Sequence, residues 1–172
     1  MKGKARSNPL YRLKDPYMVR YSDPTICPKC GVIYHNKRWF FDEEKKEYFN
    51  EKSTKKLCPA CRKIKDRFPM GVVLIEAEYL KDKKEEIRNH IMNIEKKEKI
   101  NNPLGRIMTI KNSGKNKWNI ETTTEHLAMT IGRSVAKTFG GETKFSFSKD
   151  EKFIRVCVYN YNIKKEKEKE GK

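Results

Sequence analysis

The sequence has little of what membrane proteins and most enzymes need. It has no run of 18 apolar residues, so no membrane span is expected. It has no glycine-rich phosphate loop, no His-Glu-x-x-His and no nucleophile elbow, and its three histidines, His35, His90 and His126, lie far apart along the chain. We therefore expect no membrane partner, no small-molecule substrate and no catalytic residues, and we interpret the protein as a non-enzyme.

Acidic residues are scarce beside basic ones. The 172 residues contain 40 Lys and Arg against 23 Asp and Glu, a formal net charge of +17. Residues 1–69 hold 18 basic against 8 acidic residues, whereas residues 70–163 hold 17 against 12. A basic excess concentrated in one third of the chain indicates a polyanionic partner. Nucleic acid fits better than an anionic membrane surface, because no basic amphipathic helix dominates the pattern.

Cysteine is also sparse, but four of the five cysteines form two Cys-x-x-Cys pairs. Cys27 and Cys30 make the first pair and Cys58 and Cys61 the second, with 27 residues between the pairs. Two such pairs are typical of a zinc ribbon, in which four thiolates complete a tetrahedral, structural site. Two disulfides or a redox pair are the alternatives. The first residues contain no apolar signal-peptide stretch, so we expect a reducing, cytoplasmic location, which favours zinc.

Composition divides the chain into four parts. Residues 1–24 combine basic residues, tyrosines and prolines and are expected to form a flexible basic arm. Residues 25–69 are the zinc ribbon, with an extended hairpin whose tip is predicted at residues 42–46. Residues 70–163 have the pattern of an α+β domain. Residues 164–172 are a charged, low-complexity tail, which by composition is disordered.

Hydrophobic periodicity sets out the α+β domain. We predict strands over residues 70–79, 106–110, 118–122, 144–147 and 153–161. A helix is expected after Asp82, because Asp82 and Glu85 have the spacing of a capping box. A second helix is expected after Thr122, because Thr122 and Glu125 have the same spacing. The order β-α-β-β-α-β with one added strand predicts a ferredoxin-like plan.

The last strand alternates between two kinds of side chain. Ile154, Val156 and Val158 are expected to face the helices. Phe153, Arg155 and Tyr159 would then face outward, where they could stack on unpaired bases unless another segment covers that face. Cys157 has no partner pair and is expected to be a buried, metal-free thiol.

The chain resembles small prokaryotic NMD proteins, described as affecting ribosome stability and mRNA decay, whose zinc region is related to the large-subunit nuclear export adaptor. The resemblance covers roughly residues 15–159 and implies a cytoplasmic, zinc-containing protein associated with RNA or ribosomes. The matching stretches are Asp15-Pro16-Tyr17, Cys27-Pro28-Lys29-Cys30-Gly31, Tyr34-His35, Arg38-Trp39, Leu57-Cys58-Pro59-Ala60-Cys61-Arg62, Asp66-Arg67, Pro69, Asn102-Pro103-Leu104, Arg106-Ile107-Met108, Ile120-Glu121-Thr122-Thr123-Thr124, His126-Leu127, Ile131-Gly132 and Phe153-Ile154-Arg155-Val156.

Charge, cysteines and resemblance together predict a zinc-ribbon protein that binds RNA, with a ribosomal subunit as the partner. The alternatives are a DNA-binding or transcription-associated zinc ribbon and a protein-interaction adaptor. His35 is interpreted as a surface residue, since four cysteines already fill a tetrahedral shell. The candidate nucleic-acid contacts are Lys29, Lys37, Arg38, Trp39, Arg62, Lys63, Lys65 and Arg67, with Arg106 and Arg155 as weaker ones.

Overall fold

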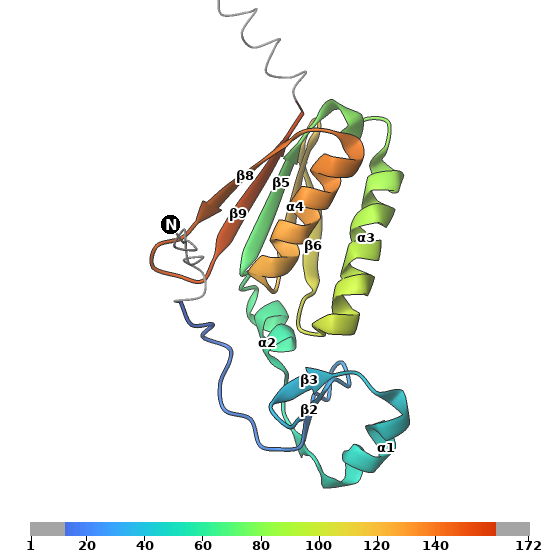
Figure 1. The fold of residues 1–172 in the computed structure, drawn as a ribbon, viewed down its shortest axis with the longest axis vertical. Coiled ribbons are helices and arrows are strands. Elements are labelled where there is room, and N and C mark those ends of the chain that lie inside the picture. Colours follow the sequence, from blue (N-terminus) through green and yellow to red (C-terminus); the bar gives the residue numbers. More distant parts are fainter. Residues whose placement is uncertain (1–12, 161–172) are drawn as a thin grey trace, which may run out of the picture.

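A computed structural model describes residues 13–160. In Figure 1 a small module with the four paired cysteines lies below a larger α+β unit, and the short helix α2 (Pro59–Asp66) connects them. The first half of the predicted arm, residues 1–12, and the predicted tail, residues 164–172, lie outside the described residues. Within residues 13–160, no helix combines the length and the apolar character needed to cross a membrane.

The small module is built on a four-stranded sheet in the order β3-β2-β1-β4. Its strands are β1 (Thr25–Ile26), β2 (Ile33–His35), β3 (Arg38–Phe40) and β4 (Thr54–Lys55). The turn between β2 and β3 has positive φ at both central residues, 50° at Asn36 and 63° at Lys37. This conformation matches the right-handed twist of a hairpin, so the turn presents Lys37 and Arg38 at its tip.

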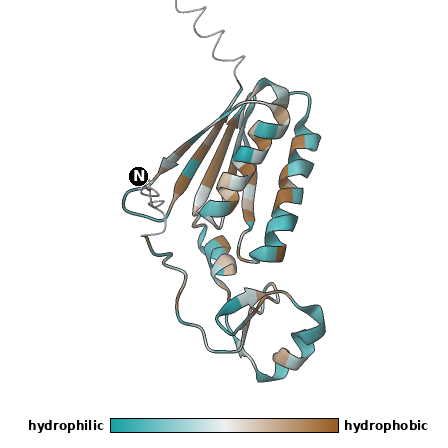
Figure 2. Cartoon of the chain, in the orientation of Figure 1, coloured by the Kyte–Doolittle hydropathy of each residue, from teal (hydrophilic) through white to brown (hydrophobic). Residues whose placement is uncertain are grey.

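The predicted hairpin tip at residues 42–46 is wrong. Those residues begin helix α1 (Glu43–Lys52) instead. Asp42 is the N-cap, and its side chain accepts a hydrogen bond from the backbone N–H of Lys45. The carboxylates of Glu43 and Glu44 in the first turn interact favourably with the positive end of the helix dipole. Phe49 is the one buried residue of this very polar helix, which Figure 2 colours mostly teal. Local capping therefore decided the structure here.

Residues 13–24, the second half of the predicted arm, pack against the module. Tyr21 is buried and its hydroxyl donates to the carbonyl of Leu57 at 3.0 Å. The Tyr17 hydroxyl donates to the Asp66 carboxylate on α2 at 2.9 Å, and the Tyr17 ring lies 5.3 Å from that of Phe68. These residues therefore belong to the module.

The larger unit contains a five-stranded sheet and two long helices on one face of it (Figure 1). In chain order its elements are β5 (Gly71–Glu76), η2 (Glu78–Leu80), α3 (Lys84–Asn101), β6 (Ile107–Gly114), β7 (Lys117–Thr122), α4 (Glu125–Phe139), β8 (Glu142–Phe147) and β9 (Ile154–Tyr159). This confirms the predicted succession of strands and helices, with one added strand at the end.

The sheet order, β6-β7-β5-β9-β8, differs from the simple ferredoxin-like arrangement. One half is a split βαβ unit, because β7 lies between β5 and β6 and is antiparallel to both. In the other half, β9 is inserted between β5 and β8 and runs parallel to β5. The strand that follows the second helix thus has no direct pairing with the first strand. The ferredoxin-like prediction is not confirmed beyond a mixed α+β unit.

The core lies between the sheet and the two helices. Leu127, Ile131 and Val135 form a stripe on α4 that is fully buried, as are the alternate residues of β9, from Ile154 to Val158. Gly132 allows α4 to approach β9, since a Cβ there would lie 2.3 Å from Val156 Cγ1. The predicted core pattern is confirmed, and a close helix–strand contact is added to it.

Neither predicted capping box forms. Helix α3 begins after Lys83, which makes no side-chain capping bond, and α4 has Thr124 as its N-cap. The Thr122 hydroxyl is turned to the carbonyls of Gly71 and Thr124. Thr122 is thus the last residue of β7, and the cap of α4 lies two residues further on.

The other face of the sheet carries Arg155, which is exposed, beside the partly exposed Cys157 and Tyr159. This agrees with the predicted alternation, although Cys157 is less buried than expected. Phe153 precedes β9 and lines a small cavity with Pro16 and Phe68, so residues 16 and 68 lie beside its ring.

Candidate metal centre and basic surface

The four paired cysteines come together in the small module. Their sulfur atoms all lie within 4.8 Å of one another, and Cys30 Sγ is 3.7 Å from Cys58 Sγ. Four sulfurs at about 2.3 Å from a tetrahedral zinc ion are about 3.8 Å apart, so the spacing fits one ion. The same distance far exceeds an S–S bond of about 2.05 Å, and all five cysteines are free thiols in this structure. The cluster can hold a metal ion.

Backbone hydrogen bonds shape the two knuckles. In the first, the N–H of Gly31 donates to the Cys27 carbonyl at 2.8 Å, and Gly31 has a positive φ of 77°, which glycine adopts readily. In the second, Cys58 is the N-cap of α2 and its sulfur accepts from the N–H of Cys61 at 3.4 Å. The second pair is therefore held by the first turn of a helix.

Without a metal the thiols restrain one another's ionisation. Hydrogen bonds from Cys30 and Cys58 lower the pKa of the Cys27 thiol, so one negative charge is favoured. Hydrogen bonding to Cys27 and Cys30, together with burial, raises the pKa of Cys58, and burial raises that of Cys61 to about 11. A divalent cation would remove this conflict, since it stabilises every thiolate that binds it.

Arg106 reaches the cluster from the α+β unit. One of its terminal nitrogens donates to Cys30 Sγ at 3.1 Å and the other to Cys61 Sγ at 3.4 Å. Its Nε donates to the Pro103 carbonyl at 3.1 Å, and the residue is 9% exposed. Burial by itself would lower the pKa of Arg106, but the hydrogen bond to Cys30 and the charge of the thiolates raise it overall.

The interpretation of Arg106 as an RNA contact is therefore wrong. Its guanidinium is turned inward, against the sulfurs, where it offsets part of their negative charge and joins the two parts of the protein. No spacing rule relates Arg106 to the cysteines, because it follows Cys61 by 45 positions, so the sequence holds no signal for this role.

Lys63 must also be removed from the candidate RNA contacts. It is 2% exposed, and its Nζ donates to the Thr123 carbonyl at 2.9 Å and pairs with the Asp15 carboxylate. Burial lowers the pKa of this ammonium group, and the nearby Asp15 carboxylate partly opposes the change. Lys63 thus fastens α2 to the N-terminal segment on one side and to the α+β unit on the other.

Trp39 and Arg62 have mainly internal contacts. The Trp39 ring packs against the cysteine cluster and lies 4.8 Å from the Tyr21 ring, so it is a packing residue. Arg62 is partly buried and stacks over the Tyr17 ring at 5.2 Å. His35 lies on the surface as expected, where its Nδ1 is 2.6 Å from the Asp23 carboxylate.

The remaining candidate cations are exposed. Lys29 lies inside the first knuckle, Lys37 and Arg38 at the hairpin turn, and Lys65 and Arg67 at the end of α2. We call these five residues the module surface. Arg155 is exposed on the sheet and belongs to a separate surface.

Comparisons with family models, with characterised proteins and with solved structures returned no match to this chain. The class that the fold and site define is thus a mixed α+β protein with a four-cysteine centre able to hold a metal ion.

Proposed function

We propose that this protein binds one structural zinc ion through Cys27, Cys30, Cys58 and Cys61 and uses the ordered module to bind RNA. Four cysteine ligands leave no open position on a tetrahedral ion, so the metal's part is to fold the module. Binding, with no catalysis of its own, is the activity proposed.

One observation carries this proposal: three of the five exposed cations of the module surface, Lys29, Lys65 and Arg67, are held by the same short segments that hold the thiols. Lys29 lies between two cysteines, and Lys65 and Arg67 lie on or just after the helix that begins at Cys58. Ion binding would thereby fix the positions of charges that suit phosphates. The net charge of +17 supports a polyanionic partner.

The partner we propose is a ribosomal subunit in the cytoplasm. This rests on the resemblance to the NMD proteins, whose matching residues span both the knuckles and the α+β unit. The contacts proposed are the module surface with Arg62 at its edge, while Arg155 is a weaker candidate on the open face of the sheet.

The salt dependence of RNA affinity tests whether the proposed binding is electrostatic. If 6–10 phosphates are neutralised, the affinity for RNA should fall on the order of 10³–10⁵-fold between 50 and 200 mM salt. An affinity that does not change with salt would contradict the proposal. Competition between ribosomal RNA and duplex DNA then separates an RNA-binding from a DNA-binding protein.

Sedimentation with ribosomal subunits tests the partner. Lys65→Glu with Arg67→Glu should release the protein from the subunit at a salt concentration that the wild type withstands. The matched control is Arg88→Glu with Lys137→Glu, which makes the same charge change at exposed positions on α3 and α4. Equal loss in both variants would show that net charge alone drives the association. Retention in both would favour a protein-interaction adaptor.

A further inference from the structure

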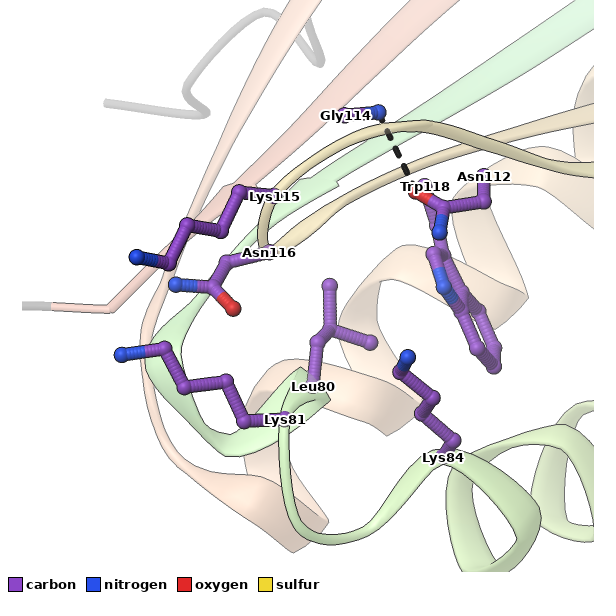
Figure 3. Close-up of a pocket in the computed structure, with 8 residues that line it drawn as sticks. All are labelled: Leu80, Lys81, Lys84, Asn112, Gly114, Lys115, Asn116 and Trp118. Carbon is purple, nitrogen blue, oxygen red and sulfur yellow. Dashed lines mark hydrogen bonds between the residues drawn. The ribbon is translucent and has the colours of Figure 1, made fainter.

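A concave site lies at the end of the α+β unit away from the cysteines, and nothing in the proposed function uses it. It has a volume of about 450 Å³ and lies between the start of α3 and the β6–β7 turn (Figure 3). Leu80 and Trp118, which are 1% and 8% exposed, form its apolar floor. The volume falls within the range of about 300–1,000 Å³ usual for small-ligand sites.

The walls of the site are basic. Lys81, Lys84 and Lys115 line it, and none of its lining residues is acidic. Among residues 13–160 these lysines form no ion pair, whereas the neighbouring Lys83 and Lys117 are paired with Glu86 and Glu76. Figure 3 shows the Lys84 amine directed between the two floor residues, with Lys81 and Lys115 on the other side of Leu80. Within the described residues, no carboxylate thus lies at ion-pairing distance from these three lysines.

Two asparagines complete the lining, and the backbone holds their loop in place. Asn112 accepts a hydrogen bond from the Gly114 N–H at 3.1 Å, and the Asn116 carbonyl accepts from the Ala77 N–H at 3.1 Å. The Asn116 side chain lies beside Lys115 in Figure 3. A side-chain amide both donates and accepts hydrogen bonds, so it can bind the polar edge of a ring as well as an anion.

We propose that this site binds a nucleoside phosphate. Lysine ammonium groups attract a phosphate as point charges, the asparagines offer hydrogen bonds, and the edge of Trp118, which is 8% exposed, can lie against a base. The ligand is either a free nucleotide or one residue of an RNA strand, and the same chemistry serves both. The site goes beyond the proposed RNA contact of the cysteine module, from which it is separated by the length of the sheet (Figure 1).

The two tryptophans of the chain provide an internal comparison. In ¹⁵N–¹H NMR spectra of the zinc-loaded protein, adenosine 5′-monophosphate should shift the indole N–H signal of Trp118 and leave that of Trp39 unchanged. Adenosine, which lacks the phosphate, should bind at least tenfold more weakly. A Trp39→Phe variant assigns the two signals. No shift at Trp118, or equal affinity for the nucleotide and the nucleoside, would overturn the proposal.

Charge removal tests the lysines. Lys81→Gln, Lys84→Gln and Lys115→Gln together should weaken nucleotide binding roughly tenfold or more, because each removes a cation beside the phosphate. The matched control removes three exposed lysines elsewhere on the helices, Lys96, Lys97 and Lys137, by the same substitution. Both variants should retain the wild-type unfolding temperature, since none of the six residues is buried. Equal weakening in the two variants would refute a specific site.

A single-stranded oligoribonucleotide distinguishes the two sources of the phosphate. If the site takes a residue of RNA, the pocket triple variant should reduce the slope of log affinity against log salt by roughly 0.7, the value for one lost phosphate contact on a single strand. If only the mononucleotide affinity falls, the site takes a free nucleotide. Either result supports the site, and neither depends on whether the cysteine module binds a ribosome.

Discussion

Replacing Arg106 by methionine should weaken metal binding without removing a single metal ligand. Methionine is of similar length and apolar, so it fills the buried space but cannot donate to the Cys30 and Cys61 sulfurs, 3.1 and 3.4 Å away. Two hydrogen bonds to thiolates and one unit of neutralising charge are lost together, and the Pro103 carbonyl loses its donor.

The expected magnitude follows from these contacts. Removing a group that hydrogen-bonds a metal ligand typically costs about 10–100-fold in metal affinity. A hydrogen bond to a charged group contributes about 1.5–3 kcal/mol, which corresponds to the same range. Arg106→Lys should lie between methionine and the wild type, because lysine keeps the charge but lacks the planar fork that spans two sulfurs.

Competition with a chromophoric chelator measures the zinc affinity, and the rate of zinc transfer to that chelator provides a second reading. Arg88→Met, at an exposed position on α3, is the control and should bind zinc like the wild type. If Arg106→Met held zinc within twofold of the wild type, the contact would be only a packing contact. If Arg106→Met lost zinc while Arg106→Lys behaved as the wild type, charge alone would account for the effect.

Three further changes have calculable outcomes. Cys58→Ser should abolish stoichiometric zinc binding and unfold the small module, which circular dichroism and metal analysis would show; one retained equivalent of zinc would refute the four-cysteine site. Lys63→Met should cost about 3–5 kcal/mol in urea unfolding because it leaves the Asp15 carboxylate unpaired, and most of that should return in the double variant with Asp15→Leu; additive losses would contradict the pairing. Gly132→Ala should destabilise by about 1–3 kcal/mol despite the better helix propensity of alanine, since its Cβ would lie 2.3 Å from Val156 Cγ1, and Val156→Ala in the same chain should recover part of the loss; a stabilised single variant would contradict the close contact.

Much of the framework was predictable from short-range patterns. The two Cys-x-x-Cys pairs predict a four-thiol cluster because each turn brings its own two sulfurs together and only one pairing of turns remains to be made. Alternation in β9 and the stripe on α4 predict the buried faces, since periods of 2.0 and 3.6 residues follow from backbone geometry. These features depend on residues a few positions apart.

The predictions that were wrong concern places where two local signals compete. Helix α1 formed where a hairpin tip was predicted because Asp42 satisfies its first turn. Thr124 rather than Thr122 caps α4, because strand pairing with β5 extends through Thr122. In both places two local signals overlap, and which one prevails depends on how neighbouring strands are paired.

By itself, then, the sequence determined the cluster of four cysteines, its basic surroundings and the succession of strands and helices. Only the tertiary structure decided that β9 enters the sheet beside β5, that Arg106 and Lys63 are turned inward, and that three lysines surround the site below the β6–β7 turn. The physical reason is the separation along the chain between the residues that interact. Ligand spacing and amphipathic periods are local properties of a chain. Where a long charged side chain lies in the fold depends instead on which distant group can neutralise its charge. For Arg106 that group is a pair of thiols 45 and 76 residues away, so this candidate RNA contact lies against the four-cysteine cluster instead.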